Sequence, residues 1–235
     1  MSIDKANFLI IDTASPQCAV LAQSGNQVFE FVESEPRQHA ESLLPMIDEA
    51  LNESGLTLAQ LDAIGVNRGP GAFTSLRIGI SAAQGLAFSV DKPVLLLSSL
   101  AAWAVSASSY TNERQFWVLL DARMNEVYAA RWQLDADNIW QLVGDESVIP
   151  IAEVDVNQYP NWHKVGSGWS LLGNNLVNDN DKVDHEFSNI YHPRSLLELA
   201  QQQWRLKQTV DAEQVLPVYL RNHVADKMVP VTNPQ

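Results

Sequence analysis

The sequence predicts an α/β protein of two related lobes, because one pattern of strands occurs in it twice. In each half an apolar strand ends in an aspartate, at Asp12 and at Asp121, and two further strands follow it after polar turns. The residue identities do not repeat, so the evidence for duplication is architectural. Each lobe is therefore expected to open with a three-stranded meander.

The polar tract 106–114 is the best candidate for a boundary between the lobes. It divides the chain into an N-terminal lobe of residues 1–110 and a smaller, degenerate C-terminal lobe of residues 111–235. The last segment of the chain is expected to pack back on the first lobe.

The N-terminal lobe is predicted to alternate strands and helices after its meander. Its expected strands are 8–11, 18–23, 28–32, 63–66 and 94–97. An amphipathic helix is predicted over 37–52, with Gly55 placed to cap it. Pro45 requires that this helix either begins near Ser42 or is kinked. Ser98 or Ser99 caps a later helix that runs to Ala107.

The C-terminal lobe is predicted to open with strands 116–120, 127–133 and 139–143. The segment 164–169 indicates a strand that enters a glycine turn, and a short helix is expected at 170–177. Residues 178–184 form a polar loop, and 193–206 is an amphipathic helix with Pro193 in its first turn.

Gly69-Pro70-Gly71 separates the strand 63–66 from a helix over 73–88. Glycine admits positive φ and proline fixes φ, so these residues predict a tight, preset turn. The turn forms either an anion site or a docking surface. A phosphate cradle needs a following Lys-Ser/Thr or a magnesium-binding carboxylate, and Ala72-Phe73-Thr74-Ser75 supplies neither. A helix kept thin by small residues instead favours docking; these residues are Gly79, Ala82, Ala83 and Gly85.

Composition narrows the class of protein. The net charge of −13 argues against a protein that binds RNA or DNA by itself, because neutralised phosphates supply most nucleic-acid affinity. The single cysteine, Cys18, excludes an intramolecular disulfide and a cysteine-based zinc site. No apolar run reaches the roughly 20 residues that a membrane-spanning helix needs. We expect a cytoplasmic protein without a membrane partner.

Other candidate sites have weaker support. Asp12-Thr13 suits either a magnesium–phosphate site or a turn closed by the aspartate, and the residues leave both open. The turn after Asp121 lacks glycine, and the loop at Gly166 lacks the Lys-Ser/Thr of a phosphate loop, so both favour structural turns. His39 has no second histidine at helical spacing, because Leu43 stands there.

Five motifs of this chain resemble those of the bacterial TsaB (YeaZ) family. They are 8–15 (FLIIDTAS), 39–45 (HAESLLP), 65–79 (GVNRGPGAFTSLRIG), 120–128 (LDARMNEVY) and 217–221 (PVYLR). The resemblance spans nearly the full length. Ala72 and Ser75 depart from it, because the family usually has Ser and Gly at these positions.

The resemblance implies a two-lobed fold of the actin/Hsp70/sugar-kinase (ASKHA) type, in agreement with the repeated meander. It also implies a non-catalytic scaffold for threonylcarbamoyl transfer to N6 of adenosine 37 in tRNAs reading ANN codons (t6A). In that system the paralogue TsaD carries the metal and catalyses the transfer, and TsaE is an ATPase. The implied partners are TsaD, as a heterodimer, and TsaE, and the implied alternative without TsaD is a homodimer.

On this reading the helices 37–52 and 73–88 form the partner interface. Its expected contacts are Leu43, Leu44, Ile47, Leu51, Leu76, Gly79, Ile80 and Ala83. Residues placed to contact an anion or nucleotide at the seam are Asp12, Thr13, Arg68, Gly69, Gly71 and Arg77. The function requires no cofactor, although ATP or ADP with Mg²⁺ could lie at the interface. Two alternatives stay open: an ATP-dependent ASKHA kinase or hydrolase using Asp12 and Asp121, and a metallopeptidase-like protein.

Overall fold

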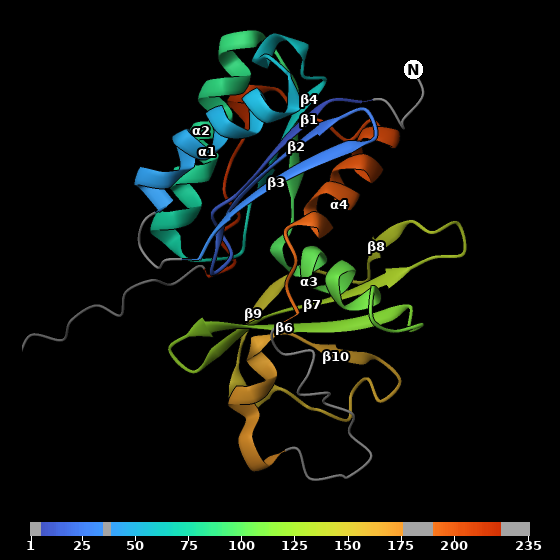
Figure 1. The fold of residues 1–235 in the computed structure, drawn as a ribbon. Coiled ribbons are helices and arrows are strands. Elements are labelled where there is room, and N and C mark those ends of the chain that lie inside the picture. The colour runs from blue at the N-terminus through green and yellow to red at the C-terminus, as the bar shows by residue number, and fades with distance from the viewer. Residues whose placement is uncertain (1–5, 35–38, 176–189, 222–235) are drawn as a thin grey trace, which may run out of the picture.

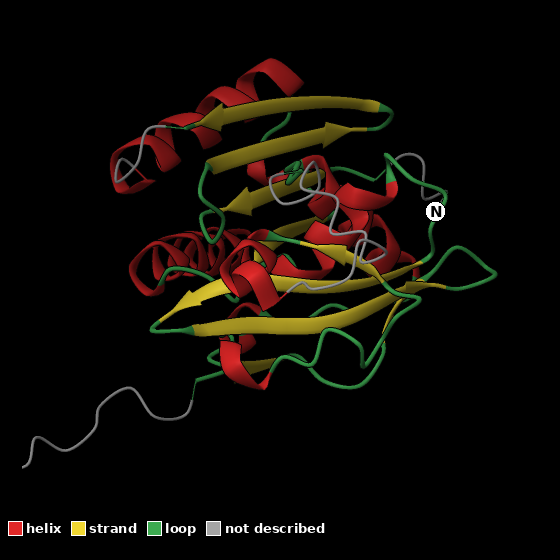
Figure 2. Ribbon diagram, turned by 90° about the horizontal axis from the view of Figure 1, so that it is seen from below, coloured by secondary structure: helices red, strands yellow, loops and turns green. Residues whose placement is uncertain are grey.

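Two five-stranded sheets organise the chain, and helices lie between and beside them (Figure 1). The structure, a computed structural model, describes residues 6–34, 39–175 and 190–221. Seen from below, the strands of the two sheets lie in separate layers (Figure 2). No helix within the described residues is long and apolar enough to cross a bilayer.

The first sheet has the strand order β3-β2-β1-β4-β5. The predicted meander is confirmed, since β1 (Phe8–Asp12), β2 (Cys18–Ser24) and β3 (Gln27–Glu33) pair as antiparallel neighbours. On the other side of β1 lie β4 (Ala63–Asn67) and β5 (Val94–Leu97), both parallel to it. Every residue of β1 is buried, as expected for the central strand of a sheet covered on both faces.

Helices cover both faces of this sheet. Alternate residues of a strand point to opposite faces, and here Leu9 and Ile11 share a core with α1 (His39–Ser54) and α2 (Phe73–Val90). Phe8 and Ile10 belong to a second core with α3 (Ser99–Ser108) and α4 (Arg194–Arg205). Helix α3 thereby packs against both the first sheet and the second.

The second sheet repeats the pairing of the first. Strand β6 (Gln115–Arg123) pairs antiparallel with β7 (Glu126–Leu134), and β10 (His163–Val165) lies parallel to β6, as β4 lies parallel to β1. The outer position beside β7 is shared by β8 (Trp140–Leu142) and β9 (Ser147–Pro150). The strand β9 was not predicted, because Pro150 interrupts its pattern. The two-lobed, actin/Hsp70/sugar-kinase-like α/β fold is confirmed.

The last described segment runs along the first sheet and then across to the second. Val210 pairs with Val94 of β5, and the Val218 N–H donates to the Arg68 carbonyl at 2.9 Å. Arg221 then reaches the turn between β6 and β7, where it forms an ion pair with Glu126 and donates to the Ala122 carbonyl at 3.0 Å.

The ends of α1 and α3 test three local predictions: the Gly55 cap, the start of the first helix and the serine cap of α3. Gly55 ends α1 with φ of 67°, and the Leu56 N–H donates to the Leu51 carbonyl at 3.0 Å, which confirms the predicted glycine cap. Pro45 lies in the interior of α1, so a helix start near Ser42 was wrong. Ser98 caps α3 by accepting from the Ala101 N–H at 3.2 Å.

Two predictions in the C-terminal lobe need correction or cannot be judged. The helix expected at 170–177 is instead a 3₁₀ helix, η4, over Ser167–Asn175. The predicted loop 178–184 lies outside the described residues.

Candidate functional site

The carboxylate of Asp12 lies at the end of β1, completely buried in a network of protein donors. Its Oδ1 accepts from the N–H groups of Ala14 at 3.0 Å and Ser15 at 3.2 Å, and from Asn67 Nδ2 at 2.9 Å. Its Oδ2 accepts from the Tyr191 hydroxyl, which comes from the segment leading into α4. A magnesium ion or phosphate at this carboxylate would have to displace these donors.

The Tyr191 hydroxyl is held in its neutral form by this arrangement. Burial, together with the charge of Asp12 and the hydrogen bond to it, raises the pKa of Tyr191 well above its usual value of 10. The ring packs on Trp103 of α3, with centroids 5.7 Å apart. Tyr191 therefore acts as a hydrogen-bond donor to Asp12 at neutral pH.

Asn67, the last residue of β4, links Asp12 to the glycine–proline turn. Its Oδ1 accepts from the Ser99 hydroxyl at 2.8 Å and from the Gly69 N–H at 3.1 Å. Gly69 has φ of 99°, a region that favours glycine. A Cβ on Gly71 would lie 2.4 Å from the Ala14 carbonyl oxygen. The glycine at 71 is thus required by the close approach of another backbone segment.

Thr13 connects the same loop to α2. Its hydroxyl donates to the Ser75 carbonyl at 2.6 Å and accepts from the Gly79 N–H at 3.1 Å. A Cβ on Gly79 would lie 2.4 Å from the Thr13 hydroxyl oxygen. Gly79 thus faces the interior of the chain, and its lack of a side chain makes room for Thr13.

The two arginines predicted to reach an anion both have protein partners. Arg68 forms an ion pair with Glu146 at 3.2 Å, and Glu146 also accepts from the Ser98 hydroxyl. Arg77 donates from Nε to the Tyr219 hydroxyl at 2.8 Å, and its guanidinium lies 3.8 Å from the centre of the Phe73 ring. These contacts hold the arginine side chains in defined positions.

The corresponding turn of the second lobe is closed by its own residues. Asp121 accepts from the Arg123 N–H at 2.7 Å and forms an ion pair with the Arg123 side chain at 3.1 Å. Arg123, Met124 and Asn125 all have positive φ without being glycines. The nearby Gly166 has φ of 105°, and a Cβ there would lie 2.3 Å from the Leu119 carbonyl oxygen. This is the geometry of a structural turn.

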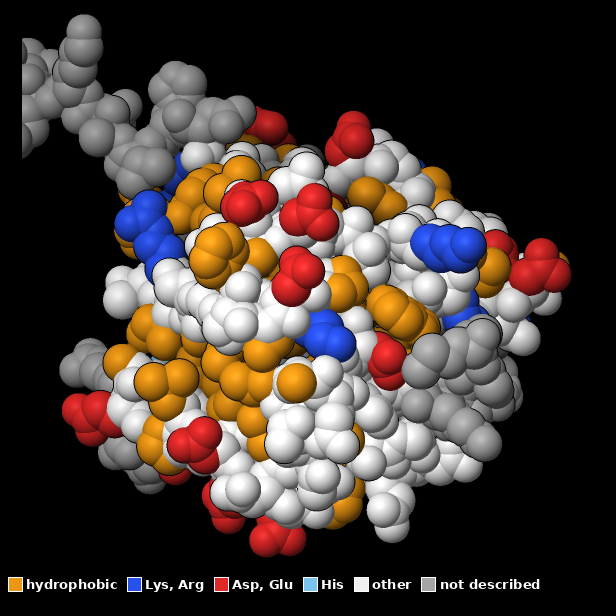
Figure 3. All heavy atoms as spheres, turned by 90° about the horizontal axis from the view of Figure 1, so that it is seen from above, with side chains coloured by type: hydrophobic (Ala, Val, Ile, Leu, Met, Phe, Trp, Pro, Cys, Tyr) orange, Lys and Arg blue, Asp and Glu red, His pale blue; other side chains and the backbone are white. Residues whose placement is uncertain are grey.

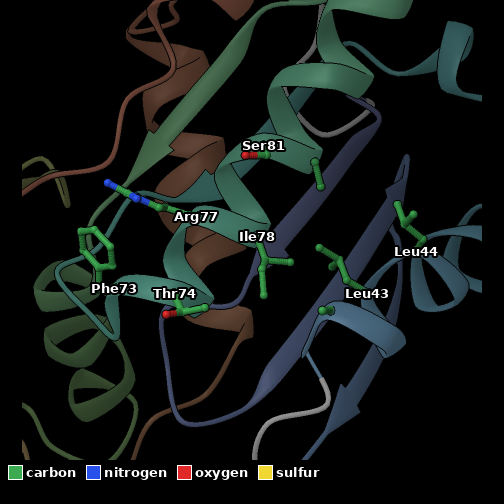
Figure 4. Close-up of a pocket in the computed structure, with 9 residues that line it drawn as sticks. Leu43, Leu44, Phe73, Thr74, Arg77, Ile78 and Ser81 are labelled. Carbon is green, nitrogen blue, oxygen red and sulfur yellow. The ribbon is translucent and has the colours of Figure 1, made fainter.

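A groove lies between α1 and α2 on the surface of the first lobe. Its volume is about 630 Å³. Leu43 of α1 and Ile78 of α2 point toward each other across it, and Phe73 and Arg77 lie on the side of α2 away from α1 (Figure 4). The lining residues are Ala40, Leu43, Leu44, Phe73, Thr74, Arg77, Ile78, Ser81 and Ala82.

The exposed side of this helix pair is unusually apolar. Leu44 is 58% exposed and Phe73 is 55% exposed, and Phe88 near the end of α2 is 70% exposed. Hydrophobic side chains gather on the side of the molecule that carries α1 and α2, with acidic side chains around them (Figure 3). Exposed apolar surface rimmed by polar groups marks an interaction site.

Burial within the chain limits which of the eight expected interface residues a partner can touch. Leu44 is exposed and Leu43 lines the groove, whereas the other six are buried: Ile47, Leu51, Leu76, Gly79, Ile80 and Ala83. The apolar periodicity identified the stripes that face the sheet. Phe73, Ile78 and Ser81 also line the groove but were not among the expected contacts, and their position opposite the buried stripe is the signal that could have identified them.

His39, the histidine considered as a metal ligand, is buried at the start of α1. Within the described ranges, no group of three or more His, Cys, Asp or Glu side chains is placed to hold a metal ion.

Comparisons of the sequence with known proteins identify a family. The family model described as TsaD, tRNA N6-adenosine threonylcarbamoyltransferase, matches residues 32–227. The tRNA threonylcarbamoyladenosine biosynthesis protein TsaB of Haemophilus influenzae is 34% identical, over 95% of this chain and 97% of that protein. The TsaB of Escherichia coli is 35% identical, over 95% of this chain and 98% of that protein.

Comparison with solved structures identifies the same family. A Pseudomonas aeruginosa protein described as similar to peptidase YEAZ has a TM-score of 0.80 at 38% identity, over 92% of this chain and 100% of that one. YeaZ of P. aeruginosa has a TM-score of 0.78 at 35% identity, with the same coverage. The chain therefore belongs to the family that the TsaD model defines and, within it, to the TsaB (YeaZ) proteins.

Proposed function

We propose that this chain serves tRNA threonylcarbamoyladenosine biosynthesis as a non-catalytic subunit that binds TsaD through the groove between α1 and α2. The observation that carries the proposal is the exposed apolar surface on this helix pair, next to strand ends whose polar groups are already bonded to protein. The names of the TsaB relatives place them in the same biosynthesis. TsaD proteins also match about two fifths of the chain, at 34% and 39% identity.

In this proposal the chain has a structural role and TsaD has the catalytic role. Asp12 and Asn67 organise the loop that launches α2 instead of holding a substrate, because each has a full set of protein partners. TsaD supplies the catalytic centre for transfer to adenosine 37, and TsaE joins the assembly in the cytoplasm. The chain requires no cofactor of its own, and any ATP or ADP with Mg²⁺ lies at the partner interface.

The test of the interface is co-purification with TsaD from the same organism. Leu44→Asp and Gly85→Trp both alter the outer face of the helix pair, and a Cβ on Gly85 meets no atom within 4 Å. Both variants are expected to fold and to lose TsaD. Leu171→Asp is the matched control, because Leu171 is 42% exposed on η4 in the other lobe. Retention of TsaD by both groove variants contradicts the assignment.

The test of the function is complementation of a deletion strain, with the modified nucleoside of tRNA measured by mass spectrometry. The unaltered chain restores threonylcarbamoyladenosine, and the groove variants do not. Restoration by a variant that has lost TsaD in solution would show that the groove is not the working surface.

The kinase or hydrolase alternative makes a different prediction at Asp12. Titration calorimetry of the isolated chain with Mg·ATP is expected to show no binding at millimolar nucleotide, because protein donors occupy both oxygens of that carboxylate. Binding that is lost in Asp12→Asn and Asp121→Asn would favour this alternative. The metallopeptidase alternative requires stoichiometric zinc or iron in the purified chain, which elemental analysis measures.

A further inference from the structure

The hydroxyl of Thr13 bridges two backbone groups of α2 that bond directly to each other in a regular helix. An α-helix is held by bonds from each N–H to the carbonyl four residues before it, and Gly79 and Ser75 are such a pair. The Thr13 hydroxyl donates to the Ser75 carbonyl at 2.6 Å and accepts from the Gly79 N–H at 3.1 Å. A side chain from the loop after β1 is therefore built into the hydrogen-bond ladder of α2.

A second close contact joins the same loop to the residues just before α2. An added Cβ on Gly71 would lie 2.4 Å from the Ala14 carbonyl oxygen, as one on Gly79 would lie 2.4 Å from the Thr13 hydroxyl oxygen. A packed interior transmits a displacement, because it holds few voids that could absorb one. A shift of this loop therefore has to move the start of α2.

Asp12, the neighbour of Thr13, ties the loop to the core between the two sheets. Its Oδ1 accepts from the Ala14 N–H at 3.0 Å, and its Oδ2 accepts from the Tyr191 hydroxyl. The Tyr191 ring packs on Trp103 of α3, in the core that α3 shares with the second sheet. Asp12 is completely buried, so the loss of this donor forces the loop to open and to let water replace it.

We propose that Thr13 is a positioning residue that couples the contact between Asp12 and Tyr191 to the first turns of α2. While Tyr191 bonds to Asp12, the loop holds the Thr13 hydroxyl in the ladder of α2, and when this contact opens, the bridge loosens. Such coupling is reciprocal, so a change at the start of α2 also weakens the contact at Asp12. Phe73 and Arg77 belong to these turns, so the coupling extends to the side chains that α2 contributes to the groove. It acts within one chain and does not depend on a partner.

Amide hydrogen exchange, measured by NMR on the isolated chain, tests the coupling. The quantity measured is the exchange rate at residues 76–79 divided by the rate at the end of α2. Tyr191→Phe removes the donor to Asp12, and we expect it to raise this ratio by about fivefold or more. A uniform loss of stability speeds exchange along the whole helix and leaves the ratio unchanged, so equal acceleration at both ends of α2 contradicts the coupling.

Tyr110→Phe is the matched control, because it removes a hydroxyl from the neighbouring contact. Tyr110 is 56% exposed, and its hydroxyl lies 2.5 Å from Nε2 of His192, the residue after Tyr191. This contact does not include Asp12, so the ratio of exchange rates is expected to stay at the value of the unaltered chain. The same rise in both variants contradicts a route through Asp12.

Substitutions at Thr13 separate the hydroxyl from the size of the side chain. In the Thr13→Val background, Tyr191→Phe is expected to leave the ratio unchanged, whereas in the Thr13→Ser background, which keeps the hydroxyl, the full rise is expected. If Thr13→Val does not fold, Gly79→Ala makes the same test, because its methyl group displaces the Thr13 hydroxyl. A rise that persists without the bridging hydroxyl contradicts the role of Thr13.

Discussion

Gly79 lies on the buried side of α2 and Gly85 on its exposed side, and the two glycines have different roles. Gly79 is buried against Thr13, whose hydroxyl oxygen would lie 2.4 Å from an added Cβ. Gly85 is exposed, and an added Cβ would meet no atom within 4 Å. The first glycine is required by packing inside the chain, whereas the second affects only the outer surface and the helix propensity.

Matched alanine substitutions at these two glycines should have opposite effects on stability. Gly79→Ala forces Thr13 to shift in a packed site and is expected to lower the free energy of unfolding by about 1–3 kcal/mol. Gly85→Ala is expected to raise it by up to about 1 kcal/mol, because alanine is the better helix former. Urea unfolding followed by circular dichroism measures both. Equal effects at the two positions would contradict the assignment of the buried face.

Tyr191 is the second residue whose role is specific to this structure. Tyr191→Phe removes the donor to one oxygen of the buried Asp12, and we expect a loss of about 1–3 kcal/mol in the free energy of unfolding near neutral pH. Asp12→Asn, which removes the charge but keeps an acceptor oxygen, provides a second measurement at the same site.

The pH dependence of Tyr191→Phe follows from the raised pKa. In the unfolded chain Tyr191 ionises near pH 10, whereas in the folded chain it stays neutral to a higher pH. The stabilisation is therefore complete below about pH 10 and declines as the pH rises through the folded pKa. The stability difference between the two proteins should narrow above about pH 10. A constant difference up to pH 11 would contradict the raised pKa of the buried Tyr191 hydroxyl.

At the scale of the element, the sequence predicted the strands and helices well because periodicity reports burial directly. The five strands of the first sheet and the helices α1 and α2 lie close to the predicted ranges. The same periodicity also selected the expected interface contacts, and most of those residues are buried within the chain. The apolar stripe that contains Leu76 and Ile80 packs against the first sheet of the same chain. The outer face of α2 consists of the other residues, which are a mixture of polar and apolar types and give no periodic signal.

The sequence could not distinguish a magnesium–phosphate site from a structural turn at Asp12, because an important hydrogen-bond partner of this carboxylate is distant in the chain. That partner, Tyr191, is 179 positions away. No local pattern indicates that a tyrosine before α4 would reach the end of β1. Contacts between lobes depend on how the two sheets are placed, and a single sequence carries no signal for that.

The segment 217–221 is an element without regular structure that joins the two sheets. Arg221 anchors it on the turn between β6 and β7, through Glu126 and the Ala122 carbonyl. Arg221→Gln should lower the free energy of unfolding by about 1–2 kcal/mol, because the arginine side chain is 21% exposed and bonds to a backbone carbonyl as well as a carboxylate.

The control for Arg221 is a more exposed ion pair between distant segments, Arg194 with Glu30. The Arg194 side chain is 64% exposed, so Arg194→Gln should change stability by no more than about 0.5 kcal/mol. Thermal and urea unfolding of both variants measure the contrast. If the two substitutions cost the same, Arg221 does not anchor the segment as the geometry indicates.

At the scale of the whole molecule, the lobes share the hydrophobic core around α3, and polar contacts also join them at the strand ends of the first sheet. Tyr191 bonds to Asp12, and Arg68 pairs with Glu146 from the loop after β8. At these strand ends the polar side chains bond to one another. The exposed apolar surface lies elsewhere, on the outside of α1 and α2.

The distribution of charge over the whole molecule leads to a last prediction, about tRNA. The chain has 15 Lys and Arg residues against 28 Asp and Glu residues. Four of the arginines that the structure describes are already paired with carboxylates: Arg68, Arg123, Arg194 and Arg221. Nucleic-acid affinity depends on basic groups that displace the counterions of phosphates. We therefore expect the isolated chain to bind tRNA with a dissociation constant weaker than about 10⁻⁴ M at physiological salt, measured by filter binding. In a complex with a basic partner, tRNA binding should appear and should fall steeply with salt, because the partner supplies the phosphate contacts. Micromolar binding by the isolated chain, with the same steep salt dependence, would mean that a local basic site outweighs the overall charge.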